Sequence, residues 1–121
     1  MKHNFRELQI WKNGIELAVS TYAICKNFPK EEIFGLSAQM KKAAVSIPSN
    51  IAEGCGRGTN PQLSHFLDIS LGSACELETQ VVIAQKLKFI NENDARTWIE
   101  LLHSEQKQIR SFRDKISAGL L

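Results

Sequence analysis

The chain lacks any run of eighteen apolar residues, so no segment has the length and apolarity of a membrane-spanning helix. Its first residues also lack the apolar stretch and the small-residue cleavage site of a signal peptide. We therefore expect a cytoplasmic protein with no membrane partner.

Cysteine is scarce, since only three are present, far apart and odd in number. This pattern argues against a disulfide framework and against a thiolate metal site. Cys25, Cys55 and Cys75 lie among apolar residues, which predicts buried free thiols. Cys–His catalysis would need a histidine beside a thiol together with an orienting partner, and the sequence indicates no such set.

Charge of one sign is also scarce, because the net charge of +2 is too small to indicate nucleic-acid binding by itself. The positive excess lies mainly between residues 36 and 60. This segment contains three cations, Lys41, Lys42 and Arg57, and one acid, Glu53. Lys12 adds a cation nearer the N-terminus. The alternative to a nucleic-acid-binding patch is that these cations form an ordinary solvated face. A symmetric assembly would, however, repeat the basic patch and strengthen its electrostatic field.

Apolar residues are present in ordinary proportion and recur at three- and four-residue steps, which predicts amphipathic helices. Four such segments cover residues of about 8–28, 36–55, 61–89 and 93–118. The 121 residues suffice for one core, and the joints between segments are short. The prediction is an all-α fold, an antiparallel up-down four-helix bundle, with residues 1–121 as one domain.

The first helix carries two apolar series. The first series recurs at the steps of one helix face and is predicted to be the core stripe. Its members are Leu8, Trp11, Ile15, Ala18, Tyr22 and Cys25. A second series, Ile10, Leu17 and Ile24, repeats every seven residues on another face. Because one bundle core cannot bury both series, we expect the second to form a subunit contact.

The second helix contains a proline, Pro48, which removes a backbone hydrogen bond and costs roughly 3 kcal/mol in a helix interior. We predict a kink rather than a break, because the apolar period continues from Ile47 to Ile51 and because Ser46 and Asn50 can bond to the disturbed backbone. The glycine-rich stretch 54–58 is predicted to end the helix, with a glycine in the left-handed conformation.

Helix ends are marked clearly in the second half of the chain. Thr59 and Gln62 have the spacing of a capping box around Pro61, Asn91 is a second cap, and Gly119 is a stop signal. The stretch 54–58 has no preceding strand and no Lys-Ser/Thr ending, so it is not a phosphate loop of the nucleotide-binding type. Contact between a phosphate and the amides that open the third helix is the alternative role of this turn.

No set of residues with catalytic or metal-binding spacing is complete in this sequence. Glu100 and His103 have the spacing of a di-iron ligand pair, but a bundle of that type needs a second pair, and none is present. Glu76 and Glu78 cannot share a helix face, so we expect one of them to pair with a lysine or arginine of the second helix. Glu53 and Arg57 are spaced for a structural ion pair. We predict no catalytic residue, cofactor or metal, and hence a non-enzymatic protein.

A specific resemblance is carried by the stretch 43–54, AAVSIPSNIAEG, followed by Gly56-Arg57. Together with LQIWK at 8–12, FPKEE at 28–32 and LGSACELETQ at 71–80, it resembles the bacterial four-helix bundle family of 23S ribosomal RNA intervening-sequence proteins. The resemblance covers residues of about 5 to 90 and implies a homopentamer. The sequence is similar also to a related branch of this family, the accessory variability protein of diversity-generating retroelements. That protein is a basic pentameric barrel that binds nucleic acid and a reverse transcriptase. By that similarity, Lys41, Lys42 and Arg57 are candidate nucleic-acid contacts.

Two functional hypotheses follow. The first is a homo-oligomer that binds RNA or DNA through phosphate contacts, with Lys12, Lys41, Lys42 and Arg57 as the contacts. The second is a protein-interaction module or scaffold that uses the apolar face of the first helix, Ile10, Leu17 and Ile24, to hold its own copies or a partner protein.

Overall fold

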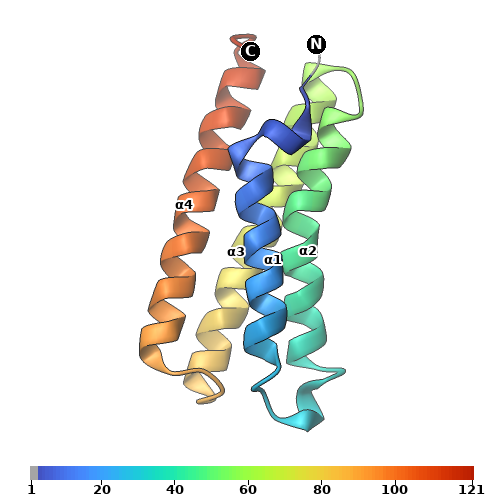
Figure 1. The fold of residues 1–121 in the computed structure, drawn as a ribbon. Helices are drawn as coiled ribbons and strands as arrows, with labels where there is room; N and C mark the ends of the chain where they lie inside the picture. Colours follow the sequence, from blue (N-terminus) through green and yellow to red (C-terminus); the bar gives the residue numbers. More distant parts are fainter. Residues whose placement is uncertain (1–2) are drawn as a thin grey trace.

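The computed structural model describes residues 3–121, and this range folds into α-helices and short 3₁₀ turns without a β-strand. The α-helices are α1 (Gln9–Cys25), α2 (Leu36–Cys55), α3 (Asn60–Lys86) and α4 (Glu92–Ser117). They run alternately up and down, so both termini lie at the end where α2 turns into α3 (Figure 1). The predicted all-α up-down bundle is confirmed. None of the helices in the described range is long and apolar enough to span a bilayer.

Side-chain caps set most helix ends where the sequence predicts them. The Thr59 hydroxyl accepts a hydrogen bond from the Gln62 amide at 3.4 Å, and the Asn91 side chain accepts one from the Asp94 amide at 2.8 Å. Gly119 ends α4 with φ +73°. α3 ends three residues before its predicted limit because Lys88 adopts a left-handed conformation, φ 63°, which lets the Phe89 amide bond to the Ala84 carbonyl.

α2 continues as one helix through Pro48, so the prediction that proline does not break it is confirmed. The Asn50 side-chain amide donates to the Ser46 carbonyl and to the Ser46 hydroxyl, both at 2.8 Å, and so supports the backbone around the proline. The kink itself stays a prediction. The left-handed glycine of the following turn is Gly58, with φ +89°, whereas Gly54 lies inside the helix.

The core lies where α2, α3 and α4 meet, and its largest members are almost wholly inaccessible to solvent. The α2 and α3 backbones approach closely enough for the Ser70 hydroxyl of α3 to donate to the Ile47 carbonyl of α2 at 2.8 Å. Such close packing is typical of protein interiors. The largest buried apolar side chains are Met40, Ile47, Ile51, Leu63, Leu67, Leu77, Val81, Trp98, Leu102, Ile109 and Ile116.

The side of α1 that faces the core is rotated by one residue step, about 100°, from the predicted stripe. Ile10 and Leu17 are 5% and 4% exposed and belong to the core, whereas Ile15 and Tyr22 are 38% and 46% exposed. Ile24 is half-buried against the core. The protomer itself covers Ile10 and Leu17, so their predicted subunit contact is wrong, whereas for the half-buried Ile24 the contact stays a prediction.

The physical reason for this rotation is Gly14, which shares the face of Ile10 and Leu17. A Cβ atom at this position would lie 3.1 Å from the Pro48 Cβ and 3.2 Å from its Cδ. Only a residue without a side chain allows α1 to approach the proline of α2 so closely. The inward side of α1 thus includes its smallest residue, whereas Ile15 and Tyr22 are exposed and Trp11 is only partly buried.

Candidate nucleic-acid and subunit interfaces

The four candidate nucleic-acid contacts do not form one cluster in the protomer. Lys12 lies in the first turn of α1 and Arg57 follows the end of α2, so both are near the same end of the bundle (Figure 1). Lys41 and Lys42 lie in the first half of α2, toward the other end. The helical rise separates Lys42 from Arg57 by about 22 Å along the axis. A single ligand would have to extend along α2 to meet all of them.

Two of these cations lie against aromatic rings. The Lys41 ammonium is 4.9 Å from the centre of the Tyr22 ring, and the Arg57 guanidinium is 4.9 Å from the centre of the Phe66 ring. Arg57 also pairs with Glu53 at 2.8 Å, which confirms the predicted i,i+4 ion pair. Glu53 therefore offsets part of the charge that Arg57 would offer a phosphate, while Lys12 and Lys42 are exposed.

A third pair was not foreseen from the sequence. The Arg6 guanidinium lies over the Trp11 ring at 5.6 Å from its centre. Trp11 and Tyr22 are three helical turns apart and so share one face of α1. That outward face thus carries two cation–aromatic pairs, Arg6 with Trp11 and Lys41 with Tyr22. The prediction missed them because it assigned both rings to the core.

α4 carries a further group of exposed cations near its C-terminal end, which the sequence analysis did not include among the contacts. Lys107, Arg110 and Lys115 are exposed. Arg113 is different, because it is held by Asp68 of α3 and by Asp114. The hydrogen bond with Asp68 is the main cause that raises the pKa of Arg113. Arg113 is thus part of the α3–α4 contact rather than a free cation.

Unpartnered apolar surface does exist on α1, but on other residues than predicted. Val19 is 65% exposed and lies beside the outward Ile15 and Tyr22. In the connection to α2, Ile33 is 53% and Phe34 is 94% exposed. Large apolar side chains that project into solvent in this way are common at protein–protein contacts.

Glu78 joins α3 to α4 instead of pairing with α2, so that part of the prediction is wrong. Its carboxylate accepts a hydrogen bond from the Gln106 amide at 2.8 Å and lies 3.0 Å from the His103 ring nitrogen. Partial burial acts to raise the pKa of Glu78, but the hydrogen bonds from Gln106 and His103 outweigh it and lower the pKa. His103 is therefore engaged by Glu78, and residues 3–121 contain no group of three His, Cys, Asp or Glu that could hold a metal.

The cysteines differ from one another more than predicted. Cys25 is buried, and burial raises the pKa of its thiol. Cys75 is exposed, so its predicted burial is wrong. Its position in α3 puts it on the outer face, one residue after the buried Ala74.

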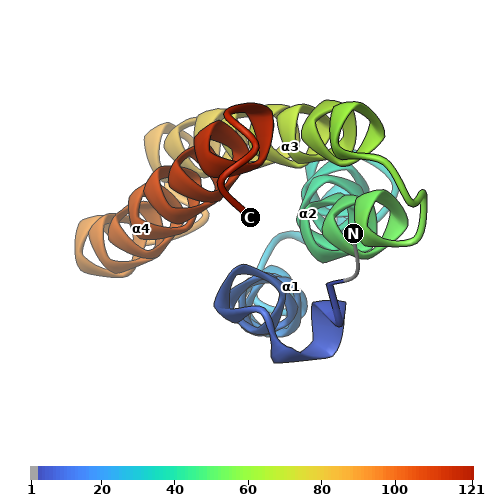
Figure 2. The same cartoon turned by 90° about the horizontal axis from the view of Figure 1, so that it is seen from above.

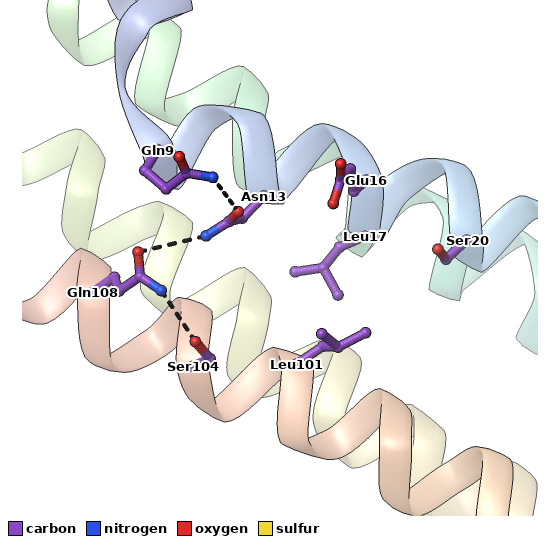
Figure 3. A pocket seen from close by; sticks show the side chains of 8 residues that line it. All are labelled: Gln9, Asn13, Glu16, Leu17, Ser20, Leu101, Ser104 and Gln108. Atoms are coloured by element: carbon purple, nitrogen blue, oxygen red, sulfur yellow. Dashed lines mark hydrogen bonds between the residues drawn. The ribbon is translucent and has the colours of Figure 1, made fainter.

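A cavity of about 350 Å³ lies between α1 and α4, where the two helices stand apart (Figures 2 and 3). Leu17 and Leu101 face each other across it. A chain of hydrogen bonds crosses the cavity at the end nearest the start of α1. The Gln9 amide donates to Asn13 at 2.8 Å, Asn13 donates to Gln108 at 3.5 Å, and Gln108 donates to Ser104 at 3.0 Å. These amides and hydroxyls can bind polar groups, but they include no nucleophile with an activating base.

A buried carboxyl group directly follows Ser104, one of the residues that line this cavity, and it was not predicted from the sequence. Glu105 of α4 is 1% exposed, and neither of its oxygens has a hydrogen-bond partner among residues 3–121. Burial raises the pKa of Glu105 to about 8, although the Asn13 amide acts to lower it. The side chain is therefore mostly protonated at neutral pH.

Comparison with known proteins places this arrangement of helices in a known group. A search of curated proteins found no match. Among solved structures, a protein of unknown function from the S23 ribosomal protein family of Bacteroides thetaiotaomicron is similar, with a TM-score of 0.77 and 20% identity over 86% of this chain and 97% of that one. At this identity the likeness shows the shared fold. The model of the 23S rRNA-intervening sequence protein family matches residues 6–111, nearly the whole bundle, and the chain therefore belongs to that family.

Proposed function

We propose that the protein is a non-enzymatic homo-oligomer, a pentamer of this bundle, that binds RNA through phosphate contacts. The family description refers to an intervening sequence of ribosomal RNA, which favours RNA over DNA as the ligand. Lys12, Lys41 and Lys42 remain our first candidates for phosphate contacts, and Arg57 is the fourth. Assembly repeats the net charge of +2 in every copy and so strengthens the attraction for a polyanion.

The observation that carries this proposal is the pairing of cations with aromatic rings on the outward side of α1 and α2. Lys41 over Tyr22 and Arg6 over Trp11 combine a positive charge with a flat ring. Single-stranded RNA is commonly bound in this way, because bases stack on aromatic rings while lysine and arginine neutralise phosphates. Tyr22 is half exposed, so a base can reach its ring.

Charge reversal at the two adjacent lysines tests this proposal. We expect Lys41→Glu/Lys42→Glu to weaken binding of structured RNA at low salt by at least about tenfold, and to make binding less dependent on salt, because each lost phosphate contact lowers the slope of log affinity against log salt by about 1. Filter binding at about 50 and 200 mM salt measures both effects, since contacts of this type weaken steeply over that range.

The matched control is Lys86→Glu/Lys88→Glu, which makes the same change of charge at exposed lysines near the end of α3. This control should bind like the wild type. Absence of binding by the wild type at low salt, or an equal loss in both variants, would show that the α2 lysines are not RNA contacts.

A second candidate function, a protein-interaction module, is supported by the exposed apolar side chains of α1 and of the connection to α2. Val19, Tyr22 and Phe34 offer apolar surface to a partner protein or to another copy. If the protein assembles but ignores RNA, this second function is the better account. The choice therefore depends on oligomeric state and RNA binding measured on the same preparation.

We expect Val19→Glu to dissociate the oligomer, because it puts a charge into an apolar contact that assembly would bury. Light scattering should give the wild type a mass that is a multiple of 13.6 kDa, and the variant a mass near 13.6 kDa. Ile83→Glu is the control, since Ile83 is a comparably exposed apolar residue on α3. A monomeric wild type, or dissociation by both variants, would refute this interface.

A further inference from the structure

Three helices meet at one point inside the bundle, at Gly14 of α1, Pro48 of α2 and Glu105 of α4. A Cβ atom on Gly14 would lie 3.1 Å from the Pro48 Cβ and 3.3 Å from Oε2 of Glu105. The carboxyl group thus packs against the bare backbone of α1 and close to the proline ring. It has no room for an ordered hydration shell there, because Glu105 is only 1% exposed.

No cation compensates this carboxyl group within the described range. The charged groups on the surrounding helices include Lys12 and Glu16 on α1, Lys41 on α2, Glu76 and Glu78 on α3, and His103 and Lys107 on α4 itself, and among residues 3–121 no charged side chain forms a salt bridge with Glu105. Among them, Lys41 lies over Tyr22, and Glu78 is engaged by Gln106 and His103. The burial that raises the pKa of Glu105 to about 8 is opposed only by the Asn13 amide. The ionised form would be a buried, unpaired charge, which proteins strongly disfavour.

The packing of α1 against α4, beside this carboxyl group, is also the weakest between neighbouring helices of the bundle. Seen from above, α1 and α4 stand farther apart than the other neighbouring helices (Figure 2). The cavity of about 350 Å³ and another of about 330 Å³, which Trp98 lines together with Ser20 and Ile24, lie along this seam. Among residues 3–121, the side-chain hydrogen bond that joins α1 to α4 is the long one from Asn13 to Gln108, at 3.5 Å (Figure 3). Little free energy therefore holds the seam closed.

We propose that Glu105 is a proton-controlled latch on the α1–α4 seam, closed when its carboxyl group is protonated and open when it is ionised. In the protonated form, the neutral side chain packs against Gly14 and the Pro48 ring. Loss of the proton creates a charge that needs water, and the cavity that Asn13 and Ser104 line offers a route by which water can reach it. α4 then moves away from α1 while its contacts with α3, such as Glu78 with Gln106, persist.

Trp98 reports on this seam directly, because it lines the second cavity about 10 Å along α4 from Glu105, two helical turns away. A Trp11→Phe background leaves Trp98 as the single tryptophan. Acrylamide, a neutral quencher, then measures how accessible the Trp98 indole is between about pH 6 and 9.5. We expect quenching of the otherwise unchanged chain to increase at least about twofold, with a midpoint near the pKa of Glu105, about 8.

Glu105→Gln in the same background keeps the shape of the side chain without the titration, so its quenching should stay low across the whole range. Glu100→Gln, an exposed glutamate on the same helix, should behave like the parent. The latch is refuted if quenching does not increase in the parent, if it increases equally in Glu105→Gln, or if far-UV circular dichroism shows that the parent unfolds as a whole.

Discussion

Replacing Gly54 by alanine is expected to destabilise the bundle by about 1–3 kcal/mol, although alanine normally favours a helix. The added Cβ would lie 2.9 Å from Leu63 Cδ1 and 2.9 Å from the Cβ of Phe66. The Leu63 carbonyl oxygen, at 3.3 Å, belongs to the α3 backbone and cannot turn away. The methyl group can be accommodated only if α2 and α3 separate where they pack most closely.

Gly72→Ala is the matched control, because a Cβ on Gly72 meets no described atom within 4 Å. This exposed helical position should gain up to about 1 kcal/mol from alanine. Urea unfolding followed by circular dichroism measures both variants, at one protein concentration because self-association would add to the apparent stability. If Gly54→Ala proved as stable as Gly72→Ala, Gly54 would not limit the α2–α3 distance.

The architecture of the bundle was accessible from the sequence because its signals are local. The caps at Thr59 and Asn91 and the stop at Gly119 depend on residues within one helical turn, and the structure has all three. The continuity of α2 through Pro48 followed from an apolar period that did not change phase. Such signals need no knowledge of neighbouring helices.

The orientation of α1 was not accessible, because both of its series are apolar and periodicity alone does not tell which face is buried. The deciding contact, Gly14 against Pro48, joins residues that are distant in the sequence. The single glycine of α1, Gly14, was the usable signal for the inward side, because glycine permits the close approach of a neighbouring helix. The outward cation–aromatic pairs were missed for the same reason.

Glu105 was missed because apolarity was used to define the core. The residue lies seven positions after Trp98, three after Leu102 and four before Ile109, which is the spacing of an inward position on α4. A glutamate at such a position is either paired or held neutral. The spacing was therefore a usable signal, and the absence of a nearby inward cation would have predicted the neutral form.

The stability of the wild type should fall as the pH rises from about 4.5 to about 8. The pKa of Glu105 is raised from 4.5 to about 8 in the folded protein, so across this window the folded state holds one proton that the unfolded state has lost. Each pH unit then removes about 1.4 kcal/mol, and the whole window removes at most about 5 kcal/mol. Below about pH 3.5 the carboxyl group is protonated in both states, and above about pH 9 it is ionised in both, so the effect is confined to the range around and between the two pKa values.

Glu105→Gln should abolish that part of the pH dependence. Near pH 4 its free energy of unfolding should match that of the wild type, because glutamine resembles the protonated side chain in shape and charge, and near pH 9 the variant should be the more stable by up to about 5 kcal/mol. Urea unfolding at each pH measures the difference, and Glu100→Gln should follow the wild type throughout. Subtracting the stability curve of the wild type from that of Glu105→Gln cancels the contribution of the titrating groups that both proteins share, including Glu78. Parallel curves for Glu105→Gln and the wild type would mean that the buried carboxyl group is not the titrating group, whatever the seam does.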